Sequence, residues 1–203
     1  MSSATRDAIL KEAEILIRTR GYAAFSYADL AERVAITKAS VHYHFPAKED
    51  LIVALLGEYL IRFETALADI KEHSAQPGQR LRAYANLFLE GFERGMLPLC
   101  GALSAERSAL PEDMRPRITD FFNIHIDWLR GVLREGLAAR ALRPDTDPDR
   151  MAMLLLSTLE GGSFVGWALQ QKEPVVAAFE SALRNIEISA PEHAQRGPPV
   201  ASA

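Results

Sequence analysis

Apolar residues recur at helical spacing along nearly the whole 203-residue chain, and no stretch alternates apolar and polar residues as a half-buried strand would. A chain with this pattern can bury its apolar stripes only by packing helices against helices. The pattern therefore predicts an all-α protein. Hydrophobic residues at 48% and charged residues at 25% are typical of a soluble globular chain.

The expected helices are short near the N-terminus and long afterwards. After a first helix that ends at Gly21, Ser26 and Thr37 can each cap a short helix. We expect a small domain in residues 1–50, a larger helical domain in residues 51–188, and a disordered tail in residues 189–203, which lacks apolar periodicity.

Proline and glycine mark the later helix boundaries. Pro77-Gly78 breaks the chain before a fifth helix, and a short sixth helix is expected from Gly101 to Ala109. Asp147-Pro148 is a clean start for an eighth helix, because a cap is followed by proline at the first helical position. Nine helices are expected in total.

The short helix after Thr37 contains few apolar side chains, so it can bury little. Val41 and Phe45 form its expected inner pair, and the remaining side chains face outward. Such a helix after a tight turn is typical of a helix-turn-helix, whose second helix enters a DNA groove. A generic helical hairpin is the alternative.

The charge of the small domain is balanced. Residues 1–50 contain seven Lys/Arg and seven Asp/Glu, so the acidic excess behind the net charge of −4 lies in the rest of the chain. This excludes a uniformly basic nucleic-acid binder. DNA binding therefore depends on where individual charges lie.

Four pieces of sequence in about residues 5–55 resemble the TetR family of transcriptional repressors. They are RGY after the first helix, DLAERV, YHF in the third helix, and KEDL at the start of the fourth. The sequence departs from the family at Ala35-Ile36-Thr37, where glycine or a small residue commonly precedes valine. It also departs at Val41-His42, where leucine-tyrosine is usual.

The resemblance implies a nine-helix TetR-like fold and a set of DNA contacts. Lys38 is the candidate for guanine, Ala39 for a thymine methyl, and Tyr43 and Lys48 for phosphates. The expected DNA-binding residues are Ser26, Tyr27, Thr37, Lys38, Ala39, Ser40, His42, Tyr43, His44 and Lys48.

The resemblance also implies that the larger domain binds a small effector and forms a homodimer through its last two helices. Glycines spaced four apart permit close helix packing, although packing within one chain is the alternative. The expected interface residues are Leu155, Leu159, Gly162, Gly166, Leu169, Phe179 and Leu183.

Aromatic residues at helical spacing in the larger domain suggest an apolar effector pocket, and ordinary core packing is the alternative for each of them. The expected pocket residues are Phe88, Phe92, Met96, Cys100, Leu103, Phe121, His125, Trp128, Phe164 and Trp167.

Cys100 is the single cysteine, which excludes an intrachain disulfide and fits a reducing cytoplasm. Residues 99–116 resemble a TetR subgroup that includes the N-ethylmaleimide-responsive repressor, in which a cysteine begins the sixth helix. A helix N-terminus can lower a thiol pKa, which would suit electrophile or oxidant sensing. The alternative is a small buried hydrophobe.

We therefore expect a cytoplasmic, homodimeric repressor that a small molecule releases from a palindromic operator. The alternatives are an activator or a ligand-binding protein of the same fold with weak DNA affinity. An enzyme is a remote alternative, because paired Glu-x-x-His motifs and phosphate-binding glycine loops are missing. We expect no catalytic residues, metal or cofactor. The apolar run in residues 151–169 approaches membrane-spanning length but is expected to be a packed helix.

Overall fold

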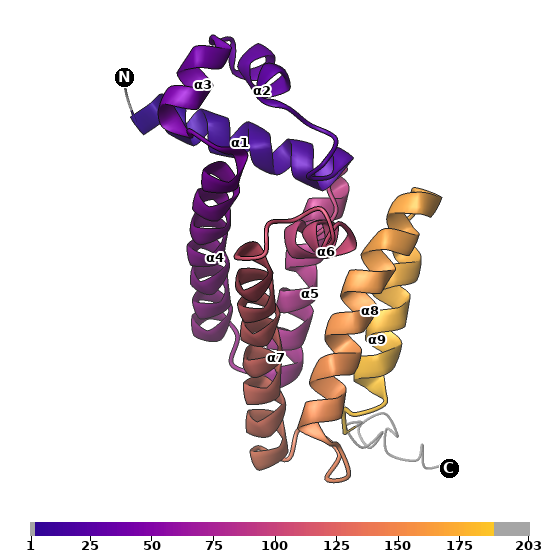
Figure 1. Ribbon diagram of the computed structural model, residues 1–203. Coiled ribbons are helices and arrows are strands. Elements are labelled where there is room, and N and C mark those ends of the chain that lie inside the picture. Colours follow the sequence, from indigo (N-terminus) through magenta and orange to yellow (C-terminus); the bar gives the residue numbers. More distant parts are fainter. Residues whose placement is uncertain (1–2, 189–203) are drawn as a thin grey trace, which may run out of the picture.

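The computed structural model describes residues 3–188, which form nine α-helices (Figure 1). The helices are α1 (Ser3–Arg20), α2 (Tyr27–Val34), α3 (Lys38–His44), α4 (Lys48–His73), α5 (Pro77–Glu93), α6 (Leu99–Ala105), α7 (Met114–Ala138), α8 (Pro148–Leu169) and α9 (Glu173–Arg184). The all-α, nine-helix prediction is confirmed for this part of the chain. The tail expected to be disordered lies outside the described residues.

Helices α1, α2 and α3 gather at one end of the molecule, and the longer helices extend away from them (Figure 1). Helix α4 leads from this cluster into the larger part, where α7 packs on α8 and α8 packs on α9. Short α6 contacts both α1 and α7. It therefore connects the N-terminal cluster with the larger bundle.

Buried apolar side chains form one continuous core through both parts. In the N-terminal cluster, Leu16 of α1, Leu30 of α2 and Val41 of α3 are fully buried. Helix α2 thus buries three residues, Tyr27, Leu30 and Ala31, and α3 buries Val41 alone, as the sparse apolar pattern of α3 predicts. A continuous core offers a route by which packing changes in one part reach the other.

The sixth helix differs from its predicted bounds of Gly101 to Ala109. It begins at Leu99, directly after Pro98, and ends at Ala105. The backbone N–H groups of Glu106 and Arg107 then bond to carbonyls three residues earlier, which tightens the chain into turns. Cys100 therefore lies within the first turn of α6.

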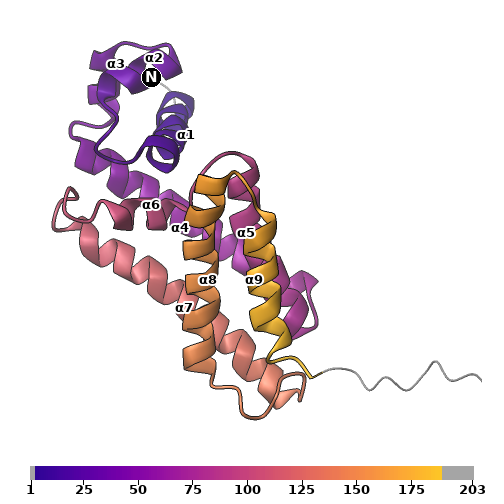
Figure 2. The same cartoon turned by 90° about the vertical axis from the view of Figure 1, so that its right-hand side faces the viewer.

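Helix α8 is, within residues 3–188, the one helix long and apolar enough to cross a membrane by length and composition. In the fold it packs against α7 on one side and α9 on another. Helices α8 and α9 lie side by side along one face of the molecule (Figure 2).

Candidate DNA interface, effector pocket and dimer face

Local hydrogen bonds fix the two short helices of the N-terminal cluster. Asp29 and Ser26 form a reciprocal capping box at α2, with Ser26 N donating to Asp29 Oδ2 at 2.8 Å. At α3, Thr37 Oγ1 accepts from Ser40 N at 3.1 Å. Capping of this kind supplies stability that such short helices cannot gain by burial alone.

Helix α3 lies at the outer end of the molecule (Figure 1) and exposes four of the ten predicted DNA-binding residues, Lys38, Ala39, His42 and Tyr43. Tyr43 is 71% exposed, whereas Val41 and Phe45 are buried beneath the helix. The exposed members of the predicted set are Ser26, Thr37, Lys38, Ala39, His42 and Tyr43, while Ser40, His44 and Lys48 are half-buried.

Tyr27 differs from its predicted role at the DNA backbone. Its side chain is buried, and its hydroxyl lies 2.9 Å from the carbonyl oxygen of Phe45 and 2.6 Å from that of Ala47. Burial raises the pKa of Tyr27 to about 12. The hydroxyl therefore ties α2 to the turn after α3 and positions the recognition helix from below.

Lys48 also faces away from the exposed surface of α3. Its Nζ donates to the carbonyls of Tyr22 at 2.5 Å and Phe25 at 2.6 Å. The same atom lies 4.0 Å from the centroid of the Phe25 ring, and burial lowers the pKa of the ammonium group. In this geometry Lys48 holds the α1–α2 loop instead of projecting toward a phosphate.

Glu106, which follows the last residue of α6, binds the same α1–α2 loop. Glu106 Oε1 accepts from Tyr22 N at 2.7 Å, and Glu106 Oε2 accepts from Ala23 N at 2.8 Å. Gly21 has a φ of +95°, and a Cβ there would lie 2.0 Å from Glu106 Oε1. The glycine of the RGY sequence is thus required both by its backbone conformation and by the carboxylate above it. No local sequence pattern predicts that Glu106 contacts the loop after Gly21.

A buried arginine joins α1 to the loop before α6. Arg18 Nε donates to the carbonyl of Leu97 at 2.6 Å, and Leu97 N donates back to the carbonyl of Arg18 at 3.1 Å. Arg18 Nη1 pairs with Glu14 at 2.9 Å. These partners satisfy a charge that is 8% exposed.

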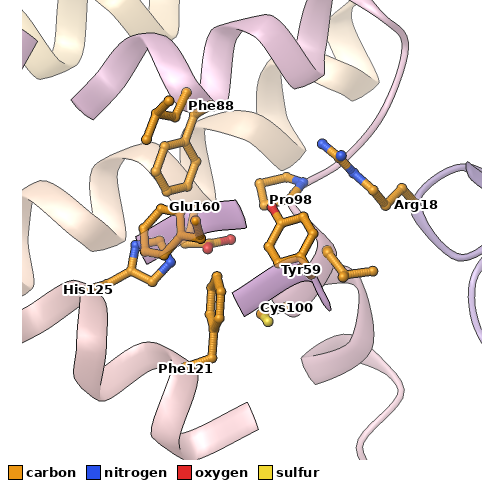
Figure 3. A pocket seen from close by; sticks show the side chains of 11 residues that line it. Arg18, Tyr59, Phe88, Pro98, Cys100, Phe121, His125 and Glu160 are labelled. Carbon is orange, nitrogen blue, oxygen red and sulfur yellow. The ribbon is translucent and has the colours of Figure 1, made fainter. Parts of the chain in front are cut away.

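A narrow pocket with a cavity volume of about 30 Å³ lies between α1, α4, α5, α6, α7 and α8 (Figure 3), so a ligand larger than one or two water molecules must push its walls apart. Four of the predicted pocket residues line it, namely Phe88, Cys100, Phe121 and His125. The remaining lining residues are Arg18, Tyr59, Phe63, Leu87, Pro98, Leu99 and Glu160. The wall contributed by α4 was missed because Tyr59 and Phe63 also fit an ordinary core stripe.

The other six predicted pocket residues lie elsewhere. Leu103 is fully buried in the core, and Trp128 stacks on Tyr84 at a ring-centroid distance of 5.2 Å. Phe92 approaches Gly166, and Phe164 approaches Gly101. Met96 is buried beside a separate surface hollow, and Trp167 is 37% exposed. Helical spacing identifies an inner face but not which neighbouring helix that face meets.

Of the two roles considered for Cys100, its position fits the small buried hydrophobe. The side chain is 1% exposed, and burial, reinforced by the negative charge of Glu160, raises the pKa of the thiol well above the ordinary value. Because the thiolate is the nucleophile, the thiol in this state is poorly reactive.

Two other polar groups face the pocket without a complete set of partners. His125 Nδ1 lies 2.5 Å from the Tyr84 hydroxyl, whereas His125 Nε2 has no hydrogen-bond partner among the described residues. Burial lowers the pKa of His125 to about 3, so the ring is neutral. Glu160 Oε2 likewise has no partner in residues 3–188, and burial raises the pKa of this carboxyl to about 7.

Most predicted dimer-interface residues are instead buried within one chain. They are Leu155, Leu159, Gly166, Phe179 and Leu183, with Gly162 half-buried. The reason is that α8 packs on α7 and on α9, and this packing within one chain buries these residues. A Cβ at Gly166 would lie 2.6 Å from the carbonyl oxygen of Gln171 in the same chain.

The outer face of α8 and α9 presents other apolar residues. Leu169 is 56% exposed, as a member of the predicted interface should be. We call the exposed set the α8–α9 face, and it comprises Met153, Leu154, Val165, Leu169 and Val176. Several large apolar side chains exposed on one pair of helices suggest a site of protein association.

Comparison with known proteins covers both parts of the chain. The family model described as bacterial regulatory proteins, tetR family, matches residues 9–55. The model described as the tetracyclin repressor-like C-terminal domain matches residues 77–182.

Solved structures and curated proteins agree with these matches. A TetR-family transcriptional regulator from Agrobacterium tumefaciens is 29% identical, with a TM-score of 0.87 over 91% of this chain and 98% of that one. Reduced NemR from E. coli is 25% identical, with a TM-score of 0.80 over 93% and 99%. The transcriptional repressor DhaR from Mycobacterium sp. (strain GP1) is 24% identical over 83% of this chain and 87% of its own. With a helix-turn-helix at one end and a matching C-terminal domain, this chain belongs to the TetR family of transcriptional regulators.

Proposed function

We propose that this regulator is a homodimeric repressor that leaves a palindromic operator when a small molecule enters the pocket lined by Cys100. The observation that carries the proposal is the position of this pocket. Its wall includes Arg18 from the DNA-binding end and Cys100 from α6, whose own end holds the α1–α2 loop through Glu106. A ligand in the pocket therefore contacts both parts of the chain.

The exposed face of α3 supports the DNA-binding role. Lys38 and Tyr43 project from it and can meet phosphates or base edges, while Tyr27 and Lys48 hold the helix in place from below. In a dimer the two copies of α3 would read half-sites about 34–36 Å apart, one turn of DNA.

The α8–α9 face supports the dimer. Its exposed apolar residues, including Leu154 and Val165, are suited to bury against a second copy of the same face. A two-fold axis through this face would form a four-helix bundle from two α8–α9 pairs. In this dimer the apolar surface of α8 is buried against protein, so α8 does not need a membrane to cover it. We therefore propose a cytoplasmic protein.

Release of DNA would pass through α6. A ligand that displaces Cys100 or Leu99 moves α6. Glu106 at the end of that helix then loses the hydrogen bonds that its carboxylate accepts from the loop after α1. The ligand needs only to prefer the arrangement in which the two α3 helices no longer match their half-sites. The raised pKa of Cys100 favours reversible binding over a covalent adduct in the unliganded chain.

The relatives include transcription regulators, and we propose no catalytic activity for this chain. DhaR is a repressor, which supports repression as the sign of regulation. The central requirement of the proposal is nevertheless site-specific binding to DNA by α3, and this requirement can be tested without knowing the effector.

The test is selection of binding sites from random duplex DNA by the purified protein, repeated with a Lys38→Ala, Tyr43→Ala double variant. We expect a palindromic consensus for the wild type and loss of enrichment for the variant, because both side chains are exposed on α3. Absence of enrichment by the wild type at low salt would contradict the proposal. Equal enrichment by the variant would show that α3 is not the reading helix.

A further inference from the structure

We infer that the pocket takes a small organic cation, a protonated amine on a compact aromatic or apolar body, with Glu160 as its charge partner. This inference rests on the proposed function, because it names the chemical class of the effector for the same pocket.

Glu160 brings a carboxyl group into the pocket from α8 (Figure 3). Its Oε2 is buried and has no hydrogen-bond partner among the described residues. The arginine in the pocket wall does not serve as one, because Arg18 is bonded to Glu14 and to the carbonyl of Leu97. A buried carboxylate without a partner is unfavourable, and a ligand that donates N–H groups with a positive charge would remove that penalty.

The sequence of α6 makes room for this carboxyl group. A Cβ at position 101 would lie 2.4 Å from Glu160 Oε2 and 3.2 Å from a ring carbon of Phe164, so glycine at this position leaves room for the carboxyl group where it lies. Glu160 is therefore accommodated against α6 by shape, without a hydrogen bond or a counter-charge from that helix. A polar group held in this way is available to a ligand.

The other walls of the pocket are largely aromatic. Tyr59 comes from α4, Phe88 from α5 and Phe121 from α7 (Figure 3). Phe63 is a further lining residue from α4. Ring centroids lie 5.1 Å apart for Phe63 and Phe121, and 5.5 Å apart for Tyr59 and Phe121. Aromatic faces attract cations, and the attraction grows when water is excluded. A carboxylate surrounded by such faces favours a cation over a neutral or anionic molecule.

His125 supplies a second polar contact without adding charge. Its ring is neutral, and Nδ1 shares one hydrogen bond with the buried Tyr84 hydroxyl. His125 Nε2, which has no partner among the described residues, is left to donate to the ligand or to accept from it, according to the tautomer. The preferred ligand therefore combines an ammonium group for Glu160 with an optional polar group for His125.

The charged and titratable groups around Glu160 make its role measurable by pH. Burial raises the pKa values of Tyr59, Tyr84 and Cys100, and it lowers the pKa of His125. Glu160 is thus the group facing the pocket that changes charge near neutral pH, since burial raises its pKa to about 7. Because the ionised fraction rises about tenfold from pH 6 to pH 8, affinity for a cation should rise about tenfold as well.

The experiment compares three probes of one skeleton, 2-phenylethylammonium, 2-phenylethanol and phenylacetate, by ligand-observed NMR and calorimetry at pH 6 and pH 8. We expect the ammonium probe to bind most tightly, and about tenfold more tightly at pH 8. In Glu160→Gln its advantage over the alcohol should fall at least tenfold. Glu64→Gln, which removes an exposed carboxylate on α4, is the matched control and should behave as the wild type.

Equal or tighter binding of the alcohol or phenylacetate would overturn the inference, as would binding of the ammonium probe that Glu160→Gln leaves unchanged. Failure of all three probes to bind folded protein would overturn it too. Operator binding, measured on the same samples, separates this inference from the proposed function. Protein that binds its operator but ignores the ammonium probe would refute only the ligand class. Protein that binds the probe in the pocket but not the operator would refute only the repressor.

Discussion

Helices α3 and α8 both present a large exposed face, but the chemistry of the two faces is opposite. Helix α3 has seven residues, and its outward side chains are polar or small apart from the aromatic ring of Tyr43. Helix α8 has 22 residues and exposes Leu154, Val165 and Leu169. A polar face on a short helix suits DNA phosphates and bases, whereas an apolar face on a long helix suits another protein surface. The difference between the two faces is the basis for proposing DNA as the partner of α3 and a second copy of the chain as the partner of α8.

Among the expected effects, the largest is the loss of dimer affinity when a charge is introduced into the α8–α9 face. Val165 is 57% exposed in one chain, and Val165→Asp would bury a carboxylate without a partner in the proposed dimer. We expect dimer affinity to fall at least about a hundredfold, measured by sedimentation. The matched control is Ile61→Asp, at a residue 65% exposed on α4, which should leave the dimer intact. Equal dimerisation of both variants would remove α8 as the interface.

The inner side of α8 has a different prediction, in which removal of a charge stabilises the chain. The folded pKa of Glu160, about 7, lies above the ordinary 4.5, so stability falls as pH rises between these values and stays low above 7. Relative to the wild type, Glu160→Gln should therefore gain about 2 kcal/mol of unfolding free energy between pH 5 and pH 8. Urea denaturation of both proteins at the two pH values measures this gain. If the difference in unfolding free energy between the variant and the wild type is the same at pH 5 and pH 8, the carboxyl group is not desolvated.

Two lysines sharpen the description of the α3 face. Lys38 is exposed, so Lys38→Ala should weaken operator binding about tenfold and lower the slope of log affinity against log salt by about 1. Lys48→Ala should instead lower thermal stability, because the carbonyls of Tyr22 and Phe25 lose their donor, and leave the salt slope unchanged. Filter binding over a salt series distinguishes them. A reduced slope for Lys48→Ala would restore its predicted role as a phosphate contact.

The smallest expected effect concerns the turn that sets the angle of α3. Ala35 has a φ of 56°, a left-handed conformation in which a Cβ is unfavourable. Ala35→Gly should stabilise the domain by about 0.5 kcal/mol, since relief of strain is partly offset by greater freedom in the unfolded chain. Thermal denaturation followed by circular dichroism measures the change. A loss of stability would mean that the turn is not strained.

Much of the fold follows from local sequence. Apolar spacing predicts the helices, and the caps at Ser26 and Thr37 predict where the short ones begin. The site is less accessible, because its chemistry depends on long-range contacts. Helical periodicity correctly marks Leu155 and Leu159 as inward-facing, but it cannot distinguish the inside of one chain from the inside of a dimer. In the same way, no local pattern connects Glu106 with the loop after Gly21.

The orientation of Lys48 and the state of Cys100 illustrate the same limit. A lysine at a helix start and a cysteine near one each have a familiar role when only the helix is considered. In the fold, two carbonyls hold the lysine, and surrounding apolar groups raise the pKa of the thiol. Burial by segments distant in the sequence therefore raises the pKa of Cys100, and no local pattern around that residue predicts this burial.

The most direct test of the account is the mass of the protein on a duplex containing its selected site. We expect two chains, or a multiple of two, on a palindrome whose half-sites lie one turn apart. The complex should be lost for Val165→Asp and kept for Ile61→Asp. A single chain bound with full affinity to one asymmetric half-site would contradict it.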